Sequence, residues 1–138
     1  MKSNNMGILF ESLDFLYVPA PDIEAAIGYY TRVLGSKLLW KIHAFGVWVA
    51  CIQVSGSGPL LLLADHIKKN DMIMIYRVSN LDNTTSILRS QGWKEAKMLE
   101  IPLGPCYTFR DPAGNCIAIY ENLRPDVMKQ FNGRIDKE

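Results

Sequence analysis

Two segments of the chain repeat one pattern of apolar and polar positions. Residues 15–37 and 73–94 each begin with an apolar run of strand character. Each continues through a polar residue that can cap a helix, and an amphipathic stretch then ends at a glycine. The two segments align at Phe15 with Ile73, Asp22 with Asn80, and Gly35 with Gly92. Because this offset is nearly constant, the pattern predicts two copies of one structural unit.

Three strand-like runs follow each predicted helix. They cover residues 37–43, 47–54 and 59–65 in the first copy, and 93–101, 106–111 and 116–121 in the second, with turn residues between them. The predicted order is therefore β-α-β-β-β, twice, in an α+β protein of 138 residues forming a single domain. Module one spans about residues 12–66 and module two about 70–121, and residues 122–138 form a polar tail with one helical turn.

Several predicted strands are apolar on both faces. The runs at 59–64 and 116–120 show no clean alternation, which is typical of a sheet covered on both sides. Helices can cover one side. The other side must then face a second layer, a partner chain or a closed cavity.

Composition narrows the classes of partner. The net charge is +1 and no block of like charge occurs, which argues against a nucleic-acid or membrane-surface partner. No apolar segment approaches the roughly 18 residues of a membrane span, and the first 15 residues do not resemble a secretory signal. We therefore expect a cytoplasmic protein. The three cysteines are scattered and odd in number, which predicts reduced core residues.

Two motifs resemble those of the vicinal oxygen chelate superfamily, which includes glyoxalase I, bleomycin-resistance proteins, extradiol dioxygenases and fosfomycin-resistance enzymes. Residues 16–35 are similar to the family's strand, Asp, helix with an aromatic-Tyr pair, and Leu-Gly. Residues 109–121 are similar to its closing Asp-Pro-x-Gly-Asn hairpin. The resemblance covers about residues 12–121. It implies paired curved mixed sheets around a cup, with the helices outside, and by analogy a homodimer.

The resemblance also indicates where a metal would bind. Family enzymes take His, Glu or Gln ligands from the first and last strands of each module, and these positions match Phe15, Ile73, Ala118 and a residue near Leu60 to Leu62. None of these side chains offers a lone pair to a divalent ion. His43 and His66 are expected to be exposed loop residues. We therefore predict no metal and no cofactor, and no motif identifies a catalytic residue.

The inward faces of the predicted strands suggest a ligand site. Strand alternation selects most of the candidate residues, and Trp40 and Trp48 are added because they could wall the cup. The ten candidate ligand-binding residues are Phe15, Tyr17, Trp40, Trp48, Leu62, Ile73, Ile75, Arg77, Ala118 and Tyr120. Such a lining suits a flat or aromatic small molecule held by stacking and a few polar anchors. The same residues could instead simply fill the space inside the fold.

Three functions stay open at this point. The first is a metal-free protein that binds a small molecule and sequesters an aromatic drug or metabolite, as the resemblance to bleomycin-resistance proteins suggests. The second is a glyoxalase I-like lyase, a dioxygenase or an isomerase with an atypical or absent metal site. The third is a structural or regulatory domain with a filled cup.

Overall fold

The computed structural model describes residues 7–68, 71–94 and 97–137. Its strands are β1 (Ser12–Pro19), β2 (Lys37–Ala44), β3 (Val47–Gln53), β4 (Leu60–Ala64), β5 (Ile73–Arg77), β6 (Lys97–Ile101), β7 (Gly104–Arg110) and β8 (Cys116–Tyr120). The helices are α1 (Ile23–Gly28), continued by the π-helical turn η1 (Tyr29–Val33), α2 (Leu81–Ser90) and α3 (Val127–Phe131). The predicted order of elements is confirmed. Residues 95 and 96 of the predicted strand 93–101 lie outside the described residues.

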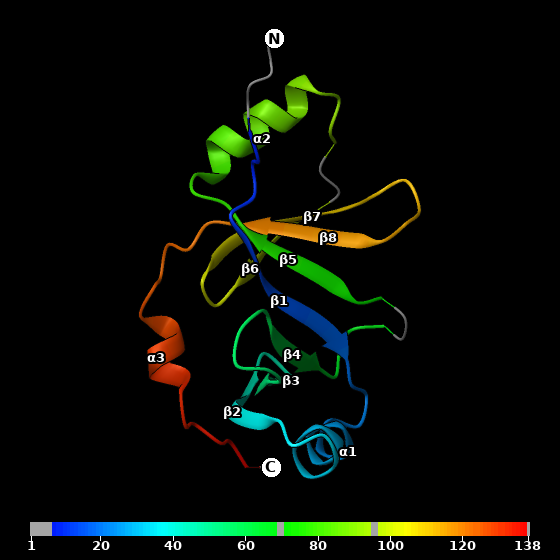
Figure 1. Cartoon of the computed structure of the whole chain (residues 1–138), viewed down its shortest axis with the longest axis vertical. Helices are drawn as coiled ribbons and strands as arrows, with labels where there is room; N and C mark the ends of the chain where they lie inside the picture. Colours follow the sequence, from blue (N-terminus) through cyan, green and yellow to red (C-terminus); the bar gives the residue numbers. More distant parts are fainter. Residues whose placement is uncertain (1–6, 69–70, 95–96, 138) are drawn as a thin grey trace.

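One mixed sheet joins both modules. Its described strands run in the order β2-β3-β4-β1-β5-β8-β7-β6, so the two halves meet where β1 pairs antiparallel with β5 (Figure 1). The first strand of each module is parallel to the last, β1 to β4 and β5 to β8. In the central pair, Phe15 lies opposite Ile75 and Tyr17 opposite Ile73. In the sequence repeat, Phe15 aligns with Ile73 and Tyr17 with Ile75, so the repeat maps each of these pairs onto the other. The two modules are therefore related by an approximate two-fold axis within one chain.

The two long helical segments cover the outer face of the sheet. Figure 1 shows α1 and α2 at opposite ends of the molecule with the sheet between them. Each begins at the predicted cap: Asp22 accepts a hydrogen bond from the Ala25 N–H at 3.0 Å, and Asn80 from the Asn83 N–H at 2.8 Å. The outer cluster under α1 comprises Ala20, Ile23, Ile27, Ala50, Ile52, Leu61 and Leu63. That under α2 is built on Val78, Leu81 and Ile119.

The end of the first helix departs from the predicted apolar stripe. The Leu34 N–H donates to the Tyr29 carbonyl at 3.1 Å, a bond that spans five residues rather than four. This wider turn rotates the following side chains about the helix axis, away from the positions that a regular α-helix would give them. Regular helical periodicity places Val33 and Leu34 on the apolar stripe of this helix, but the structure leaves them 66% and 51% exposed.

The inner face of the sheet carries a separate apolar core. Leu62 on β4 and Ala118 on β8 belong to this inner cluster, whereas their neighbours Leu61 and Ile119 pack on the outer side. The expectation that these strands are covered on both faces is confirmed. None of the described helices combines the length and apolar character needed to cross a membrane.

The C-terminal tail returns to module one and extends its covering. The Gly133 N–H donates to the Leu39 carbonyl at 2.8 Å, and the Lys41 N–H donates to the Arg134 carbonyl at 2.9 Å, so the tail is hydrogen-bonded to the edge strand β2. The Phe131 ring meets the Trp40 ring edge-on at 5.2 Å. Val127 and Met128 pack on the inner cluster as well. The tail is therefore part of the folded unit, which its polar composition did not reveal.

One glycine is required where the tail leaves module two. A Cβ atom at Gly104 would lie 2.5 Å from the Glu121 carbonyl oxygen, and the adjacent Leu103 carbonyl accepts the Leu123 N–H. We predict that Gly104→Ala lowers the free energy of unfolding by about 1–3 kcal/mol, because backbone atoms must shift to admit the methyl group. Denaturant unfolding measures this effect. Gly56→Ala, where no atom lies within 4 Å of the added Cβ, is the control and should change little; equal effects of the two substitutions would contradict the prediction.

Candidate functional site

The concave inner face is divided into two spaces by side chains at its centre. Phe15 is 5% exposed and packs in the inner cluster beside Ile75 and Ala118. Its ring centroid is 6.2 Å from that of Tyr120. On the module-one side lies a narrow chamber, and on the module-two side lies a wider cavity. Tyr17, Ile101 and Pro102 border both.

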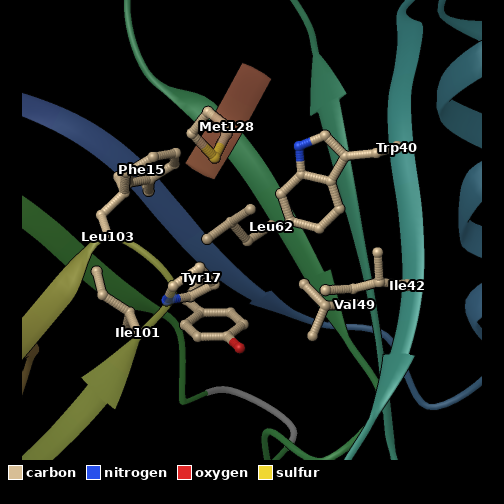
Figure 2. A pocket seen from close by; sticks show the side chains of 10 residues that line it. Phe15, Tyr17, Trp40, Ile42, Val49, Leu62, Ile101, Leu103 and Met128 are labelled. Atoms are coloured by element: carbon tan, nitrogen blue, oxygen red, sulfur yellow. The ribbon is translucent and has the colours of Figure 1, made fainter. Parts of the chain in front are cut away.

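The chamber is small and almost wholly apolar. It has a volume of about 50 Å³ and is lined by Phe15, Tyr17, Trp40, Ile42, Val49, Leu62, Ile101, Pro102, Leu103 and Met128. Figure 2 shows the module-one strands contributing Trp40 and Ile42 on one side, with Ile101 and Leu103 of module two opposite. Met128 of α3 lies over the same space. The tail thus closes a chamber that the sheet alone would leave open.

The wider cavity combines an apolar floor with a charged rim. Its volume is about 540 Å³. Ile73, Ile75 and Ala118 line its floor, and the charged side chains that line it are Lys68, Asp71, Lys97, Glu100 and Arg110, with His66 beside them. Arg110 and Asp71 form an ion pair at 2.9 Å. The rim therefore presents charges of both signs and no strong net field.

Seven of the ten predicted ligand-binding residues border one of these spaces. Phe15, Trp40 and Leu62 line the chamber, Ile73, Ile75 and Ala118 line the wider cavity, and Tyr17 lines both. Trp48, Arg77 and Tyr120 border neither.

Trp48 lies on the other face of the sheet. Cys51 pairs with Leu62 on the inner face, so by strand alternation Val49 also points inward and Trp48 outward. The Trp48 ring packs on the outer cluster and stacks on His43, with centroids 4.4 Å apart. Alternation counted from Cys51 would have selected Val49 instead.

Arg77 and Tyr120 belong to a polar cluster at the start of β1. The Tyr120 hydroxyl donates a hydrogen bond to Asp14, and Ser12 donates to the same carboxylate. The Arg77 guanidinium is 3.8 Å from Asp14 and 3.2 Å from Glu11. A break in register between Leu13 and Phe15 places Asp14 in this cluster. These polar side chains therefore pair with one another and line neither space.

Several lining residues were missed by sequence reasoning. Ile101 reaches the chamber from the end of β6, Leu103 from the turn that follows it, and Met128 from the tail. Cys106 and Thr108 line the wider cavity on β7. Alternation along β7 could have identified Cys106 and Thr108. The other three residues are placed only by tertiary packing.

The strand register identifies the fourth position at which the resemblance places a metal ligand. Phe15 pairs with Leu60 and Ile73 with Cys116, so the position in β4 equivalent to Ala118 is Leu62. Phe15, Leu62 and Ala118 are buried in the inner cluster and Ile73 packs against it. No group of three or more His, Cys, Asp or Glu side chains suited to a metal occurs in the part of the chain that the structure describes. The residues at these positions do not fit a metal ion.

Burial holds the polar groups of the cup in their neutral forms. Burial, with a smaller contribution from Asp65, raises the pKa of Tyr17 to about 12. Burial likewise raises the pKa of the Cys106 thiol to about 12, so this thiol is not an activated nucleophile. The three cysteines are free and buried, as predicted. The cup thus offers neutral hydrogen-bonding groups among apolar side chains.

Comparison with known protein families identifies the superfamily of this chain. The family model described as "Glyoxalase/Bleomycin resistance protein/Dioxygenase superfamily" matches residues 12–119, so the chain belongs to this superfamily. No curated protein sequence matches the chain at a significant level.

Solved structures share the fold. The methylmalonyl-CoA epimerase from Mycobacterium tuberculosis is 23% identical with a TM-score of 0.69, over 86% of this chain and 93% of the other. A Streptomyces coelicolor methylmalonyl-CoA epimerase variant in complex with 2-nitronate-propionyl-CoA is 13% identical with a TM-score of 0.67, over 83% and 99%. A hypothetical protein from Bacillus halodurans C-125 is 15% identical with a TM-score of 0.65, over 80% and 93%. At these identities the likeness shows the fold alone.

The pKa of Tyr17 makes stability depend on alkaline pH. The unfolded chain releases the Tyr17 proton near the ordinary pKa of 10.0, whereas the folded chain holds it to about 12. Between these values the unfolded state binds fewer protons, so the free energy of unfolding falls as pH rises. We predict that Tyr17→Phe makes this fall shallower between pH 10 and 12, measured by denaturant unfolding at fixed pH. An equally steep fall in both proteins would contradict the prediction.

Proposed function

We propose that this chain is a metal-independent binding protein for an uncharged aromatic or otherwise flat apolar molecule. One observation carries the proposal: all four positions that match the superfamily's metal ligands hold apolar side chains on the wall of the cup. Phenyl and alkyl groups cannot coordinate an ion, but they provide surface that an apolar ligand can cover.

The dimensions of the wider cavity support this function. Ligand sites commonly measure about 300–1,000 Å³, and the wider cavity has a volume of about 540 Å³. Its floor of Ile73, Ile75 and Ala118 is apolar, and the Tyr17 ring forms a side wall. The rim charges are of mixed sign. An uncharged ligand would gain by burial against this floor, whereas a strongly charged one would lose its hydration there.

An isomerase is the main alternative, because solved relatives of this fold are named methylmalonyl-CoA epimerases. Proton transfer at a carbon needs an acid or base positioned at the reacting centre. Among the described residues, the carboxylates and the histidine lining the wider cavity are Asp71, Glu100 and His66, and Asp71 is engaged by Arg110. Tyr17 and Cys106 hold their protons well above neutral pH. Asp71, Tyr17 and Cys106 are therefore poor candidates for the acid or base, and an isomerase would have to use Glu100 or His66.

Two other expectations accompany the proposal. Homodimerisation rests on the resemblance to the superfamily, and its measurement is the oligomeric state in solution. A cytoplasmic location stays a prediction from the sequence.

A neutral dye tests the proposed function. N-phenyl-1-naphthylamine fluoresces when it enters an apolar site, and we predict saturable binding at one dye per chain. Ile73→Trp should raise its Kd about tenfold or more, because the indole would occupy the cavity floor that Ile73 lines.

The matched control places the same side chain outside the cup. Met98 is 56% exposed and lines none of the described cavities, so Met98→Trp should leave the Kd of the dye unchanged. Circular dichroism verifies that both variants are folded. Absence of saturable binding, or equal effects of the two substitutions, would overturn the proposal.

A further inference from the structure

A buried hydrogen-bond donor in the chamber has no partner. Trp40 is 1% exposed, and its indole Nε1 is buried without a hydrogen-bond acceptor among the described residues. Buried polar groups in folded proteins are almost always paired, so an unpaired one calls for an explanation. Phe131 covers the Trp40 ring edge-on and offers no acceptor to it.

The unpaired nitrogen belongs to the wall of the chamber. Trp40 lines this space, and Figure 2 shows the nitrogen-bearing edge of its ring on the side that faces Met128 rather than the β2 backbone. Among the described residues, no charged side chain lines the chamber, and Tyr17 carries the other side-chain oxygen or nitrogen there. The isolated N–H donor therefore lies in the wall of an apolar enclosure, where its nitrogen is almost fully covered.

A second indole provides an internal comparison. Trp93 also has a buried Nε1 without a partner, but it lies among the rings of Tyr107 and Phe109 and lines none of the described cavities. An unpaired indole alone therefore does not make a site. Trp40 differs because empty space adjoins its ring.

The chamber adjoins the wider cavity. Tyr17, Ile101 and Pro102 border both spaces and form the wall between them, so a molecule seated in the wider cavity reaches Trp40 only when the Tyr17 side chain moves aside. A volume of about 50 Å³ exceeds the roughly 10–15 Å³ on the same measure that one water requires. It has room for one small head group rather than for a whole aromatic ligand.

We propose that the Trp40 Nε1–H binds an uncharged carbonyl oxygen, of the ketone or quinone type, at the end of an aromatic ligand. This inference rests on the proposed function and specifies the ligand's class. A carbonyl oxygen supplies the acceptor that the indole lacks. A carboxylate would be buried here without a cation, at a high desolvation cost.

Two probes of equal shape test the donor. 2-Acetylnaphthalene carries a ketone, and 2-isopropenylnaphthalene replaces its C=O with C=CH₂, which accepts no comparable hydrogen bond. Calorimetric titration gives the Kd of each probe for the wild type, for Trp40→Phe and for Trp93→Phe. The difference in hydrophobicity between the probes contributes equally in every protein. It therefore cancels when the ratio of the two Kd values is compared between the wild type and each variant.

The expected result is specific to one indole. Loss of one buried hydrogen bond should shift the Kd ratio about tenfold toward the alkene in Trp40→Phe. Trp93→Phe should retain the wild-type ratio. In ¹H–¹⁵N spectra of the wild type, the Trp40 indole signal should move downfield with the ketone and not with the alkene, which decides the question even if Trp40→Phe does not fold.

The contrary results separate the two proposals. If both probes bind but the ratio is unchanged in Trp40→Phe, or the ketone leaves the Trp40 signal in place, the carbonyl inference is overturned while the binding function stands. Ordered water that stays on the indole would give this result. If neither probe binds, the proposed function falls together with the inference.

Discussion

The antiparallel pairing of β1 with β5 is the interaction on which the cup depends. Each module alone is a half-sheet with one face covered by its helix and the other bare. Pairing the two first strands joins the bare faces into one concave surface around the Phe15–Ile75 contact. The cross-sheet rows Leu60–Phe15–Ile75–Ala118 and Leu62–Tyr17–Ile73–Cys116 follow directly from this register. A shift by one residue would send these side chains to the outer face and remove the cup.

Those rows explain why the same fold can hold different chemistry. The four positions that match metal ligands in the superfamily converge from two strands of each half, so donors placed there would meet at one point. In this chain the point is occupied by apolar side chains, and Phe15 divides the cup instead of lining a single metal centre. The tail then closes one half through Met128 and Phe131, and the other half stays open to a ligand. The geometry of the fold is kept while its inner surface changes from coordinating to apolar.

Local signals in the sequence were sufficient for the fold and for most of the cup. The caps at Asp22 and Asn80, the glycines that end the helices and the alternation within β1 and β5 act over a few residues, so they could be predicted from the sequence. The orientation of Trp48 required the register of β3, which depends on its partner strand. Ile101 and Met128 enter the chamber from the end of β6 and from the tail, and their places depend on contacts between segments distant in the sequence. The widened turn η1 was likewise invisible in a stripe that assumed a regular helix.

The central claim is that apolar side chains have taken the place of a metal centre in a fold that can build one. The measurement that tests it most directly is the metal content of the purified, untagged protein by mass spectrometry after growth with nickel, zinc, manganese and iron. The account predicts far less than one transition-metal ion per chain, with no change when a chelator is applied. One ion per chain that resists dialysis would contradict it, because the described residues contain no group of donors that could hold such an ion.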